Sequence, residues 1–286
     1  MNPPVITDGA WGTELQALGL DHGDCPDLWN LTEPDKVQSV ASSYVDAGSE
    51  IILTNTFRAN RIALEGYGLA GRAAEINRAG VEISLRAAGG RARVFASVGP
   101  SGKLLVADEI AAEDLRIAFS EQCQALAAAG ANGLVVETMG DLDEASIALE
   151  EALATGLPVV GSAVFDSGRN KDRTITGATP EKAAARLTAA GATIVGANCG
   201  CGIEGYIDIC RRLRNSTDRP IWIKANAGLP SMVDGRPTYL MSPTGYARYA
   251  TALIEAGASY IGGCCGTSPE FIRELRATIR GAALCA

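Results

Sequence analysis

The sequence is short of histidine, of positive charge and of long hydrophobic runs, and each shortage excludes a class of function. Its single histidine, His22, stands in the polar stretch GLDHGD, where we expect it to be solvated. Hydrolysis by a Ser-His-Asp triad needs a histidine that takes the proton of a nucleophile. The sequence therefore gives little support to that chemistry.

The charge balance argues against nucleic acid as a partner. The 25 lysines and arginines are outnumbered by 33 acidic residues, which leaves a formal net charge of −8. Affinity for a phosphate backbone depends on Lys and Arg contacts, so an acidic chain is repelled by it. The one basic cluster, Arg211, Arg212 and Arg214, is typical of the last turn of a helix, where cations suit the helix dipole.

Signals for membranes and secretion are also missing. No stretch approaches 18 consecutive apolar residues, and the start MNPPVITDGAWGTE has no basic region followed by an apolar run. We therefore expect neither a membrane span nor a signal peptide. Eight cysteines without a secretion signal indicate thiols that are kept reduced, and so a cytoplasmic protein. Cys123 and Cys210 fall within helical patterns and are expected to be small buried side chains.

What the sequence does contain is a regular alternation of short apolar runs with longer Ala-rich amphipathic segments. The runs are nearly continuous in hydrophobicity, as expected of strands buried on both faces. We predict strands at 4–8, 50–56, 93–99, 133–138, 158–165, 193–199, 220–227 and 260–265. We predict helices at 35–47, 70–88, 109–129, 141–155, 179–190, 204–214, 243–256 and 268–280.

The connections between these segments carry helix signals and no linker. A glycine stops a predicted helix in DAGSE, AAGAN, AAGAT and EAGAS, and SPTG and TSPEF place Ser or Thr before a Pro that suits the first helical turn. The alternation predicts an α/β protein of one domain, residues 1–286, folded as a single (β/α)8 TIM barrel. A doubly wound open sheet is the alternative, and the even count of eight units disfavours it.

Polar residues gather at the predicted strand ends. Active sites of (β/α)8 barrels lie at the C-terminal ends of the strands. Six of the eight ends carry polar or thiol side chains, so we expect one polar pocket to be formed by Asp8, Thr54, Asn55, Thr56, Glu137, Asn198, Cys199, Asn226, Cys264 and Cys265.

Three of these residues are cysteines, which favours a metal site. Cys199 ends the sixth strand, and Cys264 and Cys265 end the eighth. Three thiolates with a fourth position open are the layout of a catalytic zinc site. Consecutive residues on a strand face opposite ways, so both reach one ion only where the strand breaks, and the flanking glycines permit that bend. The alternatives are a vicinal disulfide or two inert buried thiols.

A competing motif follows the first of these cysteines. The stretch GCGIEG, Gly200 to Gly205, matches the glycine pattern of a dinucleotide-binding turn, with Asp218 at a fitting distance. It belongs to the sixth βα unit rather than the first, and it directly follows Cys199. A nucleotide-dependent oxidoreductase is therefore one alternative function, and a non-catalytic zinc- or thiol-binding barrel is another.

Two carboxylates, Asp8 and Glu137, end the first and fourth strands. In one interpretation Asp8 caps the following loop and Glu137 pairs with a lysine. Burial at a barrel mouth without a fixed partner instead favours a role in receiving a cationic group of a substrate.

Six segments together resemble the homocysteine S-methyltransferase family: DGAWGTELQ, AGSEIILTNTFRAN, VVETM, GANCG, KANAGLP and GGCCGTSPE. The resemblance runs through essentially the whole chain in order, and the combination of NC with GGCCG is its most specific part. The family includes the homocysteine-binding module of cobalamin-dependent methionine synthase, the betaine–homocysteine methyltransferases and the S-methylmethionine-dependent enzymes.

The resemblance implies a zinc enzyme that methylates homocysteine to methionine. The family's zinc cysteines fall on Cys199, Cys264 and Cys265. The acidic residues that hold the homocysteine ammonium fall on Asp8 and Glu137, and we expect the carboxylate to lie on backbone N–H groups of GAWG. The substrate sulfur takes the fourth zinc position and attacks an activated methyl group without a separate general base. Two further residues, Thr54 and Asn226, are expected at the substrate. Asn226 lies near the metal, and the substrate thiolate displaces it or a water from the fourth zinc position.

The partners implied are homocysteine and a methyl donor, which is a small molecule or a corrinoid protein. Betaine enzymes hold a quaternary ammonium in an aromatic box by cation–π contact. The corresponding loop here, DCPDLWNLTEP, carries Trp29, which the sequence does not place in such a box. We therefore expect a sulfonium or protein-borne donor to be used in preference to betaine. With no cobalamin-binding domain after the barrel, methylcobalamin is expected to arrive on a separate protein.

Overall fold

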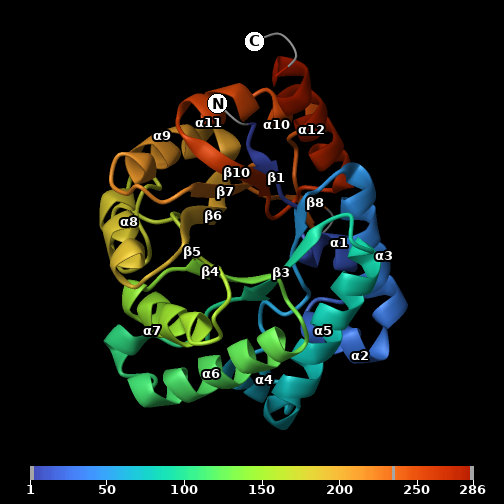
Figure 1. Cartoon of the computed structure of the whole chain (residues 1–286), viewed down its shortest axis with the longest axis vertical. Helices are drawn as coiled ribbons and strands as arrows, with labels where there is room; N and C mark the ends of the chain where they lie inside the picture. The colour runs from blue at the N-terminus through green and yellow to red at the C-terminus, as the bar shows by residue number, and fades with distance from the viewer. Residues whose placement is uncertain (1–2, 234–235, 284–286) are drawn as a thin grey trace.

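Eight parallel strands form one sheet that closes into a barrel in the computed structural model, which describes residues 3–233 and 236–283 (Figure 1). The strand order is β1-β10-β7-β6-β5-β4-β3-β2, and a parallel bridge between Thr7 and Ile51 joins the two edges. The strands are β1 (Val5–Ile6), β2 (Ile51–Ile52), β3 (Arg93–Val98), β4 (Gly133–Met139), β5 (Val159–Ala163), β6 (Ile194–Gly202), β7 (Ile221–Asn226) and β10 (Ala258–Gly263). The predicted (β/α)8 TIM barrel is confirmed.

Helices surround the strands on the outside of the ring (Figure 1). The longer ones are α3 (Pro34–Ala47), α5 (Ala73–Ala88), α6 (Ala112–Ala128), α7 (Leu142–Leu153), α8 (Pro180–Ala189), α9 (Ile203–Arg214) and α12 (Pro269–Ala283). The short ones are α1 (Gly12–Ala17), α2 (Trp29–Thr32), α4 (Arg61–Glu65), α10 (Pro243–Ala247) and α11 (Ala250–Glu255), with 3₁₀ turns η1 (Pro26–Leu28), η2 (Ala70–Arg72) and η3 (Leu105–Ala107). Within the described ranges, none of these helices combines the length and hydrophobicity that a membrane crossing requires.

The local signals act as predicted. The four glycines expected to stop helices all have positive φ angles; the φ of Gly48 after α3, for example, is 98°. The Ser242 side chain accepts the N–H of Gly245 at the start of α10, and a cap of this kind contributes about 1 kcal/mol. The three arginines of the predicted basic cluster lie in the last turn of α9. Cys123 and Cys210 are fully buried.

Several predicted boundaries are wrong: the first two strands are shorter than 4–8 and 50–56, and the sixth continues past residue 199 to Gly202. The segment 243–256 is two helices, because the N–H of Tyr249 bonds to the carbonyl of Tyr246 three residues back and tightens the turn there. The last barrel strand stops at Gly263 rather than at residue 265. A two-stranded antiparallel hairpin, β8 (Ser231–Val233) and β9 (Arg236–Thr238), was not predicted, and neither were the short helices α1, α2 and α4.

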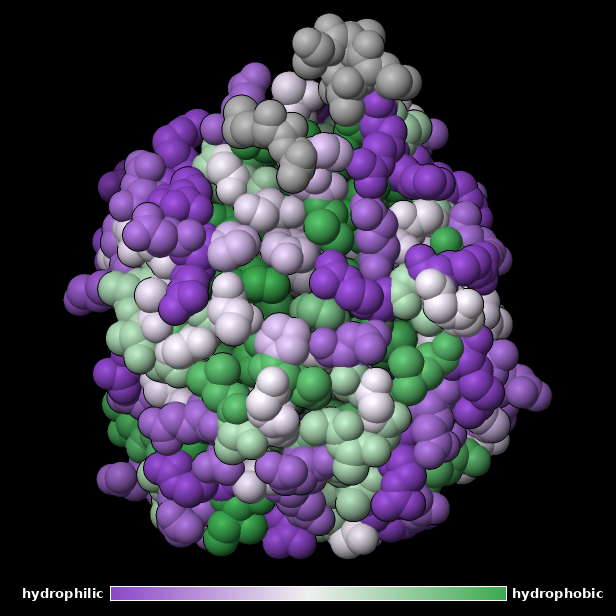
Figure 2. All heavy atoms as spheres, in the orientation of Figure 1, coloured by the Kyte–Doolittle hydropathy of each residue, from purple (hydrophilic) through white to green (hydrophobic). Residues whose placement is uncertain are grey.

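The barrel interior is filled by one apolar layer of side chains. This layer contains Ile51, Leu53, Phe95, Val135, Val160, Ile194 and Trp222. The rings of Phe95 and Trp222 are stacked with their centroids 6.4 Å apart. Figure 2 shows one end of the barrel, where hydrophobic side chains are visible toward the middle and hydrophilic ones cover most of the margin. The barrel is therefore a packed core and not a pore.

A polar layer lies next to this apolar layer, toward the C-terminal ends of the strands. Alternate residues of a strand point to the same face, so inward positions recur every two residues. Five inward residues beyond the apolar layer are buried and polar: Ser97 on β3, Glu137 on β4, Ser162 on β5, Asn198 on β6, where Gly196 comes between it and the layer, and Lys224 on β7. The strand period thus places five polar side chains together at one end of the barrel.

Candidate metal and substrate site

Three cysteine thiols meet at the C-terminal ends of β6 and β10. The Sγ atoms of Cys199, Cys264 and Cys265 all lie within 4.8 Å of one another, and those of Cys199 and Cys265 are 3.8 Å apart. All three are free thiols, so the structure contains no vicinal disulfide between Cys264 and Cys265. The backbone of Cys199 has a φ of 63°, a left-handed conformation that a residue with a side chain adopts rarely and that is enriched at functional sites.

A tight turn after β10 brings the two adjacent cysteines to the same place. The N–H of Thr267 donates to the carbonyl of Cys264 over 3.1 Å, and Gly266 within this turn has a φ of 81°. The expectation that all the flanking glycines permit the bend is correct for Gly266 alone. Gly262 and Gly263 are needed for close packing instead, because an added Cβ would collide with Thr7 and Thr267 respectively.

The thiol cluster fits a tetrahedral zinc ion. Zinc binds cysteine sulfur at about 2.3 Å, and a tetrahedral angle between two such bonds separates the sulfurs by about 3.8 Å. This equals the distance from Cys199 to Cys265. Asn226 adds a second observation: its Nδ2 donates to the carbonyl of Gly200 over 2.9 Å, while its buried Oδ1 has no hydrogen-bond partner among the residues described. A buried amide oxygen that has no hydrogen-bond donor can instead coordinate a cation held by the cysteines.

The thiols also influence one another's protonation. Contacts from the Cys264 and Cys265 thiols lower the pKa of Cys199 to about 3, because both can donate to its thiolate. Contact with Cys199 raises the pKa of Cys265 to about 12 and that of Cys264 well above its usual value. A cation bound among the three sulfurs would favour the thiolate form of each.

Glu137 lines the same cavity as the three thiols. This cavity has a volume of about 290 Å³, at the small end of the range for ligand pockets. The carboxylate of Glu137 accepts hydrogen bonds from Ser97 Oγ at 2.6 Å and from Asn198 Nδ2 at 3.0 Å. Burial raises the pKa of Glu137 to about 7, against the opposing effects of the Lys224 charge and the Ser97 hydrogen bond. A buried carboxylate of this kind is stabilised when a cation binds beside it.

Asp8 has a fixed partner, contrary to the expectation that it stands alone. Its Oδ1 pairs with the ammonium of Lys224, and both side chains are fully buried. Its Oδ2 accepts the indole N–H of Trp11 over 2.8 Å and the backbone N–H of Leu53 over 2.7 Å. Sequence periodicity did not reveal this pair because the two residues are 216 positions apart.

Thr54 lines the cavity, but its hydroxyl hydrogen is already in use. Thr56 donates to the carbonyl of Ser97 at 2.7 Å, so the contact of 2.6 Å between the two threonine hydroxyls must be donated by Thr54. Its oxygen also accepts the N–H of Ser97 over 3.1 Å. Thr54 therefore retains acceptor capacity only.

Three polar residues of the site were not singled out as functional from the sequence: Ser97, Asn198 and Lys224. Asn198 was expected to help form the polar pocket but was given no role there; its Nδ2 contacts Glu137 and also lies 4.0 Å from the Sγ of Cys264. Ser97 and Lys224 each stand two residues after an apolar barrel residue, Phe95 and Trp222, and Asn198 stands four residues after Ile194, with Gly196 between them. Period-two counting from the apolar layer finds them.

Other candidate residues lie away from the thiols. Trp29 packs in the core outside the barrel, with the ammonium of Lys36 4.6 Å from its ring centroid. The Sγ of Cys201 lies 3.6 Å from the carbonyl of Phe165, and Cys201 does not belong to the thiol cluster. In GCGIEG, β6 runs through Gly202 and α9 begins at Ile203, so no glycine loop separates strand and helix to receive a phosphate.

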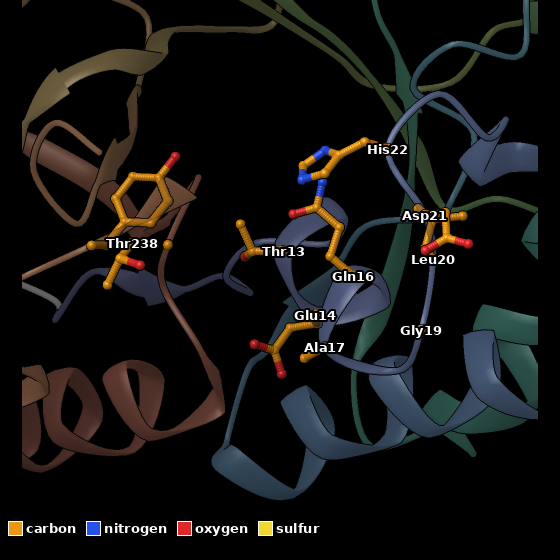
Figure 3. Close-up of a pocket in the computed structure, with 11 residues that line it drawn as sticks. Thr13, Glu14, Gln16, Ala17, Gly19, Leu20, Asp21, His22 and Thr238 are labelled. Atoms are coloured by element: carbon orange, nitrogen blue, oxygen red, sulfur yellow. The ribbon is translucent and has the colours of Figure 1, made fainter. Parts of the chain in front are cut away.

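A second pocket of about 560 Å³ lies beside the barrel mouth (Figure 3). Thr13 and Glu14 of α1 face Thr238 across it, and His22 points toward Gln16 at its rim. His22 is exposed, as predicted. The described residues that line this pocket include Thr13, which also lines the thiol cavity, but none of the three clustered cysteines.

Fold and site together define a class: an α/β barrel that presents three thiols and a buried carboxylate in one cavity at the C-terminal ends of its strands. A sequence model described as homocysteine S-methyltransferase matches residues 5–279. With that match over most of its length, the chain belongs to the homocysteine S-methyltransferase family.

Similar proteins agree with this placement. The chain is 31% identical over 301 residues to a methionine synthase of Mycobacterium tuberculosis, covering 96% of this chain and 24% of that protein. It is 28% identical over 291 residues to the methionine synthase of Mycobacterium leprae, with the same coverage. The chain thus spans about a quarter of the length of these curated relatives.

Solved structures show the same fold. The metallated form of the homocysteine methyltransferase MmuM from Escherichia coli matches with a TM-score of 0.79 and 24% identity, covering 96% of both chains. Its oxidized form matches with a TM-score of 0.77 at the same identity, covering 96% of this chain and 95% of that one.

Proposed function

We propose that the chain is a zinc-dependent S-methyltransferase that converts homocysteine to methionine. The observation that carries the proposal is the cavity in which three thiols, placed as zinc ligands, lie beside the buried carboxylate of Glu137. In the proposed reaction the thiolate sulfur of homocysteine bonds to the methyl carbon of the donor. The bond from that carbon to the donor's leaving atom breaks, and the leaving atom keeps the electron pair.

Cys199, Cys264 and Cys265 would hold the zinc ion, with Asn226 at hand through its unpartnered Oδ1. When bound, zinc supplies a positive charge that favours the thiolate forms of the cysteines and of the substrate. No side chain need accept a proton during methyl transfer itself, because the acceptor sulfur has already lost its proton. The fully buried Tyr246, whose hydroxyl donates to the carbonyls of Ala225 and Gly262, fixes the backbone on either side of the cluster.

Glu137 is the proposed receptor for the substrate ammonium. Its two donors, Ser97 and Asn198, favour the ionised carboxylate, and an incoming ammonium compensates the cost of burying that charge. Asp8 contributes a further contact through the remaining lone pair of Oδ1 and holds Lys224 in place. Thr54 lines the substrate site and holds the ends of β2 and β3 together through Thr56 and Ser97.

The methyl donor is proposed to be a sulfonium compound or a methyl-carrying protein such as a corrinoid protein. The aromatic residue in the loop that could have formed a cation box, Trp29, lies in the core and not at the cavity. We also propose that the protein works in the cytoplasm, because seven of its cysteines are free thiols, as a reducing compartment maintains them.

The test is product formation by purified, zinc-loaded protein. Homocysteine is supplied with S-methylmethionine, S-adenosylmethionine, betaine or methylcobalamin in turn, and methionine is measured. We expect methionine with at least one of these donors. A protein that holds zinc but yields no methionine with any of them would instead be a structural or thiol-binding barrel. Thermal stabilisation by NAD in place of methionine formation would favour the oxidoreductase alternative.

A further inference from the structure

Lys224 is a buried cation in the substrate cavity that the proposed reaction has not yet used. It lies inside the barrel, between the inward-facing Trp222 and Asn226 on β7, and is 1% exposed. It lines the same cavity as Glu137 and the three clustered cysteines. Its charge lies near enough to Glu137 to oppose the effect of burial on the pKa of that carboxyl.

The ammonium of Lys224 has more donors than the protein uses. Among residues 3–233 and 236–283, Asp8 is the one side chain or carbonyl that accepts a hydrogen bond from Nζ. A lysine ammonium has three N–H donors. Removing it from water costs several kcal/mol, which one carboxylate offsets only when the other donors are also satisfied. Two N–H donors of the Lys224 ammonium are therefore left over at the cavity, and an anionic ligand in the cavity would accept hydrogen bonds from them.

Three other groups that line the cavity are less suited to receive an anion. The N–H of Ala10, in the GAWG segment expected to hold the substrate carboxylate, donates to the carbonyl of Thr267 over 3.0 Å. The Thr54 hydroxyl has no hydrogen left to donate. Arg58, the other cation that lines the cavity, is an exposed residue beside Asp27, whose carboxylate accepts its backbone N–H.

We propose that Lys224 binds the α-carboxylate of the acceptor amino acid, while Glu137 binds its α-ammonium. The site then recognises a zwitterion attached to a thiol, and Asp8 positions Lys224 for this contact. Thiols without a carboxylate are poor acceptors because the Lys224 donors remain unsatisfied in their complexes. This inference rests on the proposed function and adds the group that selects amino-acid thiols.

The experiment measures kcat/KM for each of two proteins with each of two thiol substrates. Wild type and Lys224→Met are compared with homocysteine and with 3-aminopropane-1-thiol, which lacks only the carboxylate. A hydrogen bond to a charged group contributes about 1.5–3 kcal/mol, so wild type should favour homocysteine by roughly 10- to 100-fold in kcat/KM. Lys224→Met should lose most of that preference, with homocysteine turnover falling by this factor and 3-aminopropane-1-thiol turnover changing less than about threefold.

Removing one partner of a buried ion pair leaves the other charge unpaired, so Lys224→Met alone risks misfolding. The double variant Asp8→Asn/Lys224→Met removes both charges and is measured in parallel, with calorimetric binding of both thiols as a second readout. Equal losses for the two substrates would mean that Lys224 is only a counter-ion for Asp8, and would overturn the inference. So would a wild type that does not discriminate between them. A wild type that neither binds nor methylates homocysteine would reject the proposed function itself.

Discussion

The Nδ2 atom of Asn198 donates a hydrogen bond to Oε2 of Glu137 over 3.0 Å and lies 4.0 Å from the Sγ of Cys264. The amide is held from its other side, because Oδ1 accepts the hydroxyl of Ser162 at 2.7 Å and the N–H of Thr138 at 2.8 Å. One rigid side chain on β6 thus connects the candidate ammonium receptor with the candidate metal ligands.

Asn198→Ala should weaken homocysteine binding in a pH-dependent way. The substitution removes a hydrogen bond to the ionised form of Glu137, which raises the pKa of that carboxyl further. At pH 7 we expect KM for homocysteine to rise about tenfold, the equivalent of a hydrogen bond of about 1.5 kcal/mol. At pH 9, where Glu137 is ionised again, KM should return toward wild type. Ser162→Ala, which only loosens Asn198, should have a smaller effect. A KM increase that is the same at both pH values would argue against this role.

Glu137→Gln should keep its zinc and lose homocysteine use. The charge-assisted contact with the substrate ammonium is worth about 1.5–3 kcal/mol, so kcat/KM should fall roughly 10- to 100-fold. Because the pKa of Glu137 is about 7 in the free protein, wild-type kcat/KM should rise as the pH increases through 7. The variant should lack that rise. Glu204→Gln, an exposed change in the first turn of α9, is the control and should behave as wild type. Unchanged kinetics for Glu137→Gln and Asp8→Asn alike would remove both carboxylates from the substrate site.

The zinc ligands are tested by four cysteine variants. Wild type should contain about one zinc per chain by elemental analysis, and Cys199→Ser, Cys264→Ser and Cys265→Ser should each lose most of it. The serine hydroxyl stays protonated at neutral pH and is a harder ligand than a thiolate. Cys201→Ser is the matched control, because its thiol lies outside the cluster, and it should retain zinc.

Homocysteine should change the zinc environment in the wild type. X-ray absorption should show three sulfur neighbours without homocysteine and four with it, at about 2.3 Å. About one proton should be released at pH 7, because the substrate thiol must ionise to bind a metal. Loss of zinc from Cys201→Ser but not from Cys199→Ser would make the ligand assignment wrong. A shell that stays at three sulfurs would indicate a structural site.

Asp27 should make the protein less stable at alkaline pH. Burial raises its pKa from 3.8 to about 7, so its contribution to stability is complete below about pH 4 and is lost as the pH rises through 7. Asp27→Asn cannot ionise and keeps an oxygen for the N–H of Arg58. Relative to wild type, its free energy of unfolding in urea should improve by roughly 2 kcal/mol between pH 5 and pH 8. The exposed change Asp24→Asn should show no such difference. Parallel curves for Asp27→Asn and wild type would contradict the prediction.

The four methyl donors should differ in kcat/KM. We expect a sulfonium compound or a methyl-carrying protein to give a higher kcat/KM than betaine. Trp29 is packed in the core beneath Lys36, so it offers no face to a quaternary ammonium in the cavity. Trp29→Leu should accordingly lower stability without changing the order of donors. Betaine as the best of the four donors would show that another part of the cavity forms the cation site.

The sequence by itself determined the barrel and the meeting of the three thiols. Eight apolar runs alternating with amphipathic segments define eight βα units, and the C-terminal ends of parallel strands converge whatever the details of packing. The sequence pattern therefore predicts that Cys199, Cys264 and Cys265 lie together, and that Asp8 and Glu137 lie at the same end of the barrel.

Only the tertiary structure decided how those groups are paired. The strand period tells which side chains point inward, but not which neighbour each one meets once the barrel has closed. Closure brings Lys224 to Asp8 from 216 residues away and leaves Glu137 with two neutral donors, so the two carboxylates have different roles. It also sets Gly262 and Gly263 against Thr7 and Thr267, which makes them packing residues and leaves the bend to Gly266. The face of a strand on which a side chain lies follows from the local sequence. The side chain that it contacts depends on segments far away in the sequence, and no local pattern predicts it.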